Sequence, residues 1–125
     1  MNDKILSFVA AEAITEFALV SVNTAGKVVI TDAATDARCI GIAQRACDSG
    51  DSVEVLVQGT SRVIAGATIA NTVSLVMATT DGKVATHATT GNYSIGQILP
   101  NINQVSSSAG DQILIKFTGP NNLLP

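Results

Sequence analysis

The chain has 125 residues, of which 46% are apolar and 14% are charged, so it holds enough apolar material for one hydrophobic core and is not typical of a disordered polypeptide. A formal net charge of -3 and a pI near 4.8 argue against a nucleic-acid-binding surface, which needs clustered Lys and Arg. Every apolar run is shorter than the roughly 18 residues of a membrane-spanning helix. Aromatic residues make up only 3%, so Val, Ile, Leu and Ala must build the core.

Residues 1–16 are predicted to form an arm that stands apart from the rest of the chain. The arm carries four large apolar residues, which are Ile5, Leu6, Phe8 and Val9. Asp3 and the interruption of the apolar run at Ser7 disfavour a secretory signal peptide. The segment has no counterpart later in the sequence. Such an arm can add a strand to a neighbour's sheet, but a terminal strand that completes the sheet of its own domain would have the same sequence pattern, so both alternatives stay open.

Residues 17–59 are predicted to form a hairpin followed by two more strands. The β-prone runs in this part of the chain are 17–22, 27–31, 38–43 and 53–58. The hairpin turn ends in Gly26, which can adopt the positive φ that such turns need. The third run contains Ile40-Gly41, and the fourth follows Gly50-Asp51 and alternates between apolar and polar residues. Gly59 is expected to end this strand.

Residues 60–119 are predicted to contain the same elements in the same order. The β-prone runs here are 60–65, 73–78, 83–86, 93–99 and 113–117. Asp81-Gly82 gives the second hairpin a stronger turn signal than the first one has. Ile95-Gly96 lies in the next run, and Gly110-Asp111 precedes the last. Between these two motifs, residues 101–110 are rich in Ser and Asn and are expected to form an exposed loop.

The recurrence of these motifs indicates an imperfect tandem duplication. The length differences between the copies fall in loops, as expected of related units. We therefore predict a single all-β domain, a compact barrel or sandwich built from two tandem pseudo-repeats with an N-terminal arm. Its parts are the arm 1–16, the repeats 17–59 and 60–119, and a tail 120–125. Six alternating residues are expected to face one shared core: Val53, Val55, Val57, Ile113, Ile115 and Phe117.

Residues that could perform chemistry are few. His87 is the only histidine and lies in a Thr-rich link, so we predict no catalytic triad and no enzyme. Cys39 and Cys47 are too few for a zinc site, and Cys39 is interpreted as a small core residue, while a disulfide between the two stays open. A carrier domain with a swinging lysine is disfavoured, because Gly-Lys-Val occurs in both copies. We predict no cofactor and no metal.

Together, the order and spacing of the Gly-Lys-Val, Ile-Gly and Gly-Asp motifs over residues 17–119 resemble those of tailed-bacteriophage capsid cement (decoration) proteins. Two features depart from the family pattern, the Ile69-Ala70-Asn71-Thr72 stretch and the long Ser-rich loop. The resemblance implies a structural protein of the virion, made in the host cytoplasm, that binds and stabilises the outside of the capsid shell. It also implies the major capsid protein as partner and a homotrimer as the oligomeric state, with no nucleic acid or membrane involved. A secreted or surface β-module, such as an adhesin or fibre subunit, is the alternative.

Two sets of contact residues follow from this interpretation. The arm residues Ile5, Leu6, Phe8 and Val9 are predicted to contact the capsid. Leu56 and Leu114 lie on the strand faces opposite to the expected core, so we predict that they are exposed on one chain and covered in the oligomer.

Overall fold

A computed structural model of the chain describes residues 4–33, 38–67, 69–70, 75–86, 93–99, 106–107 and 110–121. These residues form β-strands and one 3-10 turn, η1 (Thr80–Gly82), so the predicted all-β class is confirmed. The first part of the chain supplies β1 (Lys4–Val9), β2 (Leu19–Val22), β3 (Val28–Ile30), β4 (Cys39–Ala43) and β5 (Ser52–Ile64). The second supplies β6 (Ile69–Ala70), β7 (Leu75–Ala78), β8 (Val84–Thr86), β9 (Ser94–Ile98), β10 (Ser106–Ser107) and β11 (Gln112–Asn121).

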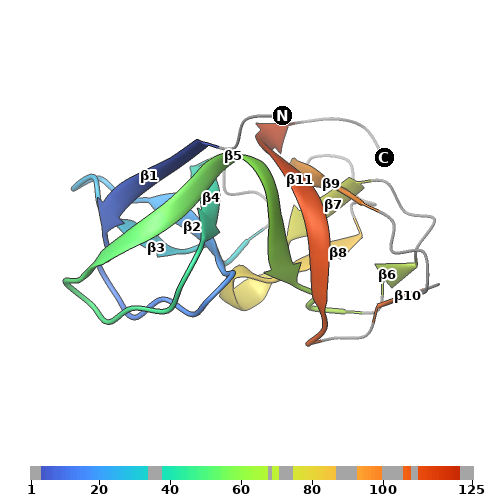
Figure 1. Ribbon diagram of the computed structural model, residues 1–125, viewed down its shortest axis with the longest axis horizontal. Helices are drawn as coiled ribbons and strands as arrows, with labels where there is room; N and C mark the ends of the chain where they lie inside the picture. Colours follow the sequence, from blue (N-terminus) through green and yellow to red (C-terminus); the bar gives the residue numbers. More distant parts are fainter. Residues whose placement is uncertain are drawn as a thin grey trace.

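The strands form one antiparallel sheet that coils into a half-barrel. Its order is β3-β2-β4-β5-β11-β9-β7-β8, with β1 also paired to β5, while β6 and β10 form a separate small ladder. Figure 1 shows β5 and β11 arching between a lobe that holds β1 to β4 and a lobe that holds β7 to β9. Both predicted hairpins are present as β2–β3 and β7–β8, and both Ile-Gly runs are strands, β4 and β9.

The two ends of the sheet have matching strand order and matching registers. In the first half, Val20 of β2 pairs with Ile30 of β3 on one side and with Gly41 of β4 on the other. In the second half, Val76 of β7 pairs in the same way with Thr86 of β8 and Gly96 of β9. Both ladders with the Ile-Gly strands also contain a register shift one residue later. That the halves descend from one duplicated unit stays a prediction.

β1 is a strand of the chain's own sheet and not a free arm. It pairs with the first part of β5, from Lys4 opposite Gln58 to Val9 opposite Ser52. The last part of β5 pairs with β11 in the same register. Ser61 lies opposite Ile115, and at the matching place in the first half Leu6 lies opposite Val55. The expectation that this segment has no counterpart is therefore wrong for β1. The match was not visible in the sequence because it rests on backbone pairing, and the side chains differ.

β5 is longer than predicted and belongs to both halves. Gly59 was expected to end the strand, but the backbone passes through Gly59 with φ of 125° and continues to Ile64. The boundary expected between residues 59 and 60 therefore falls inside one strand. A glycine at this point allows the strand to bend from the first lobe into the second, because a positive φ is strained for other residues.

The apolar side chains form two cores, which differs from the single shared core that was predicted. The minor core lies in the first lobe and contains Ala10, Ile14, Ala18, Val20, Val28, Ala43, Val53 and Val55, with Val57 partly buried against it. The main core contains Ile113, Ile115 and Phe117 with their neighbours in the second lobe. Four residues from the first half also belong to the main core: Leu19, Cys39, Ile42 and Leu56. The first lobe is thus apolar on both faces of its sheet.

Leu56 is buried, which contradicts the prediction that it is exposed on a single chain. It is 1% exposed and packs in the main core, while Val55 beside it is buried in the minor core. The alternating pattern identified one buried face of β5, but the second half of the chain covers the other face as well. Leu114 is 43% exposed, as predicted, and is not enclosed by its own chain.

The two Ile-Gly motifs mark points where neighbouring strands pass very close to each other. A Cβ on Gly41 would overlap the carbonyl oxygen of Leu56 and lie 2.5 Å from Cγ1 of Val55. A Cβ on Gly96 would lie 2.6 Å from the carbonyl oxygen of Lys116. Any larger residue would force β4 away from β5 or β9 away from β11, so the glycines permit the tight curvature of the sheet.

Candidate contact surfaces

The described residues contain no group of three or more His, Cys, Asp or Glu side chains that could hold a metal ion. Cys39 is buried and Cys47 half-buried, and no disulfide joins them. The interpretation of Cys39 as a core residue is confirmed. His87 lies outside the described residues. In the part of the chain that the structure covers, no helix is both long enough and apolar enough to cross a membrane.

Strongly exposed apolar side chains concentrate on β1. Among the described residues, the exposed large apolar side chains are Ile5 at 51%, Leu6 at 45%, Val9 at 39% and Leu114 at 43%. Because side chains alternate along a strand, Ile5 and Val9 share one face of β1, and Leu6 and Phe8 share the other. Phe8 is half-buried against the minor core. The four predicted capsid-contact residues therefore lie on one strand but point to two sides.

The face of β1 that carries Ile5 and Val9 is bordered by an ion pair. Glu54 lies opposite Ser7, and its Oε1 accepts a hydrogen bond from Nε of Arg45 at 2.6 Å. Arg45 also donates to the carbonyl oxygen of Ser52. The hydrogen bond and charge of Arg45 lower the pKa of the Glu54 carboxyl, and the same hydrogen bond raises the pKa of Arg45. The apolar face is thus bordered by two charged side chains whose charges neutralise each other.

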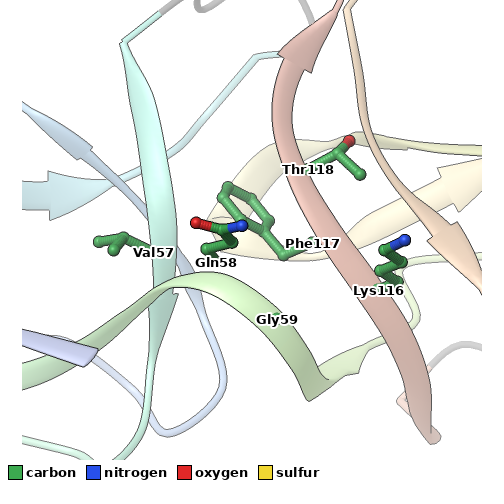
Figure 2. Close-up of a pocket in the computed structure, with 6 residues that line it drawn as sticks. All are labelled: Val57, Gln58, Gly59, Lys116, Phe117 and Thr118. Atoms are coloured by element: carbon green, nitrogen blue, oxygen red, sulfur yellow. The ribbon is translucent and has the colours of Figure 1, made fainter. Parts of the chain in front are cut away.

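An open groove of about 380 Å³ lies where β5 and β11 separate. Its lining residues come in two consecutive triplets, Val57, Gln58 and Gly59 of β5 and Lys116, Phe117 and Thr118 of β11. Figure 2 shows the amide of Gln58 beside the ring of Phe117 between the strands, with Lys116 and Thr118 across β11. Among the residues that line the groove, Lys116 is the only charged one and Thr118 is the only one with a hydroxyl group.

Leu114 lies apart from β1, on the outer face of β11. Its neighbours across the ladder are Arg62 on β5 and Leu99, whose backbone N–H donates to the Leu114 carbonyl at 2.9 Å. The structure therefore brings Ile5, Leu6, Phe8 and Val9 together, leaves Leu114 separate and encloses Leu56. Leu99 was not singled out from the sequence. Its place after the second Ile-Gly strand, matching Gln44 after the first, is the signal that would have found it.

Comparison with known proteins identifies the family. Residues 2–116 match the phage cement protein family, which covers most of the chain. The chain belongs to this family. The cement protein also resembles a solved structure described as the head fiber gp8.5 N base in bacteriophage phi29, with a TM-score of 0.71 and 15% identity over 94% of this chain and 95% of that chain. No curated protein matches the chain.

Family membership confirms the class of function expected from the resemblance. The cement protein is a structural protein of the phage head and associates with the exterior of the capsid. The likeness to the head fiber base concerns the fold, because the identity is low. The surfaces described above are therefore best judged as contact surfaces.

Proposed function

We propose that this cement protein binds the outside of the phage shell as a homotrimer and braces neighbouring copies of the major capsid protein, without catalytic activity. The observation that supports this most is the concentration of exposed apolar side chains on β1, a strand fully paired on one edge by its own chain. Exposed apolar patches with polar borders are typical of protein contact sites.

The capsid contact is assigned to the face of β1 that carries Ile5 and Val9. Both side chains are exposed there, and the neighbouring Glu54 carboxylate is already paired with Arg45. A surface of this kind can be covered without burying an unpaired charge, which would be costly. Leu114 supplies a second, separate apolar contact.

The test uses shells that lack the cement protein and purified variants added back to them. Ile5→Gln combined with Val9→Gln should abolish co-sedimentation with shells while the melting temperature stays close to that of the original chain. Ile64→Gln is the matched control, because Ile64 holds the position in the second half that Val9 holds in the first, as their pairing with Gln112 and Ser52 shows. Undiminished binding of the double variant would refute the capsid contact.

A base for a longer head fibre is a second candidate function, favoured by the fold likeness to the head fiber N base. The two candidates differ in what the virion contains. A cement protein should be present in purified virions as a species near 12.8 kDa. A fibre base would be found there as the first domain of a heavier chain, which mass spectrometry would detect.

A further inference from the structure

The two halves of the chain are held together by a specific head-to-tail contact. Nε2 of Gln44, just after β4, donates a hydrogen bond to Oγ of Ser61 in β5 at 3.1 Å. The backbone N–H of Gly82, in the turn of the second hairpin, donates to the carbonyl oxygen of Thr31 at 2.8 Å. This turn is tightly packed, since a Cβ on Gly82 would lie 2.9 Å from Cβ of Ala18. The first half thus contacts the second at two places, at the last part of β5 and at the turn of the second hairpin.

The residues that match these contacts lie on β1 and just after β9. Leu99 matches Gln44, because its N–H donates to Leu114 as that of Gln44 donates to Glu54, both at 2.9 Å. Leu6 matches Ser61, because their partners in the ladders, Val55 and Ile115, are equivalent. The positions that match the hydrogen-bonded pair Gln44 and Ser61 are therefore both occupied by leucine. Leu6 is 45% exposed and Leu99 is half-buried.

We propose that the contact between the two halves recurs between copies of the chain, so that Leu99 of one copy packs on Leu6 of the next. This inference rests on the proposed self-association and names its surface. Two leucines that meet would bury the apolar area that each exposes alone, as Gln44 and Ser61 satisfy each other inside the chain. The turn of the first hairpin holds the position of the packed turn at Gly82, but a Cβ on Gly26 would meet nothing within 4 Å. This turn is therefore available for the same contact with the next copy.

The charge of the two halves favours this head-to-tail arrangement over a symmetric one. Residues 1–58 contain eight acidic and four basic side chains, whereas residues 59–125 contain two acidic and three basic ones. Contact between a first half and a second half therefore joins opposite net charges, and a contact between two first halves would join like charges. At the positions that match the buried Ile42 and Leu56, the second half presents Gln97 and Lys116. A contact between separately folded copies is accordingly more polar at its centre.

The arrangement divides the surface of β1 between two partners. A head-to-tail contact generates a ring when its rotation closes, and three copies would place six matching halves around the ring. Leu6 then faces the next copy, while Ile5 and Val9 on the opposite face of β1 remain available to the shell. Leu114 matches Glu54, whose side chain is 44% exposed beside the internal contact, so Leu114 also stays outside the ring contact.

Cysteine cross-linking tests the proposal directly, in a background with Cys39→Ala and Cys47→Ser. Chains with Leu6→Cys and chains with Leu99→Cys are oxidised separately and as a mixture, both free and bound to shells. The mixture should give a disulfide dimer of one chain of each kind, whereas neither variant alone should cross-link. Cross-linking of Leu6→Cys with itself would show a two-fold contact and overturn the proposal, as would a mixture that fails to cross-link on shells.

A second measurement separates this inference from the proposed function. Leu99→Gln should weaken self-association at least tenfold by sedimentation velocity or on shells, whereas Ile64→Gln, outside both proposed contacts, should leave it unchanged. If Leu99→Gln assembles as well as the original chain and shells are still bound, the head-to-tail contact is wrong and the cement function stands. Loss of shell binding by the original chain itself would instead refute the proposed function.

Discussion

Gly41 is the residue at which the curvature of the sheet is most sensitive to substitution. Gly41→Ala should lower the free energy of unfolding by about 1 to 3 kcal/mol, because the added Cβ overlaps backbone and side-chain atoms of β5. Urea unfolding would measure the change. Gln97→Ala, at an exposed position next to Gly96 in the equivalent strand, is the control and should have little effect. An alanine at Gly41 that is tolerated without loss would show that β4 can move away from β5.

Leu56 is the residue at which the buried second face of β5 can be tested. Leu56→Ala should destabilise the chain by about 2 to 5 kcal/mol, since it removes a fully buried side chain from the main core. Leu114→Ala changes the same residue type at an exposed site and should cost far less. Equal effects of the two substitutions in urea unfolding would contradict the burial of Leu56.

The Arg45–Glu54 pair gives the stability a small dependence on acid pH. Arg45 lowers the pKa of Glu54, so the folded chain holds this carboxylate ionised more readily than the unfolded chain does. The stabilisation is therefore complete above the ordinary carboxyl pKa and is lost as the pH falls through the lowered folded-state pKa. The melting temperature of Glu54→Gln should lie slightly below that of the original chain at pH 7 and converge with it in acid. A difference that persists in acid would rule out this pair as its source.

At the scale of the elements, β1 is expected to stabilise the first lobe as a member of the sheet. Deletion of residues 1–9 would leave one edge of β5 without its partner and uncover the minor core around Val53 and Val55. We expect a clearly lower melting temperature, so a deletion cannot measure the capsid contact by itself. Phe8→Ala, which leaves the backbone pairing intact, should cause a smaller loss. An unchanged melting temperature after the deletion would show that β1 contributes no stability.

The same elements show what could and could not be predicted from the sequence. Glycine turns and alternating residues identified both hairpins and both Ile-Gly strands, because these signals are local. The predicted strand ended too early, because a glycine often marks the end of a strand, whereas Gly59 lies at a bend within β5. The pairing of β1 and the burial of Leu56 depend on what lies across the sheet, and no local pattern records this. The capsid contact of the β1 residues stays a prediction, and the match between Leu99 and Gln44 required the registers.

At the scale of the whole molecule, the two cores are expected to unfold together. β5 passes through both lobes, and Leu19, Ile42 and Leu56 of the first half pack in the main core. Tyr93 is the single tyrosine and there is no tryptophan, so tyrosine fluorescence reports on the second half while circular dichroism reports on all strands. The two signals should show one coincident thermal transition. Two separate midpoints would mean that the lobes are independent.

The continuity of β5 also affects how the chain folds while it is being made. During synthesis the strands that complete the first lobe emerge early, but residues 59–64 of β5 must wait for β11, which is made after β7, β8 and β9. Until then, the edge of β5 and the side chain of Val63 are open to other chains. Unpaired edges and exposed apolar residues of this kind promote aggregation during folding. Slow translation of the second half should therefore lower the yield of soluble protein more than slow translation of the first.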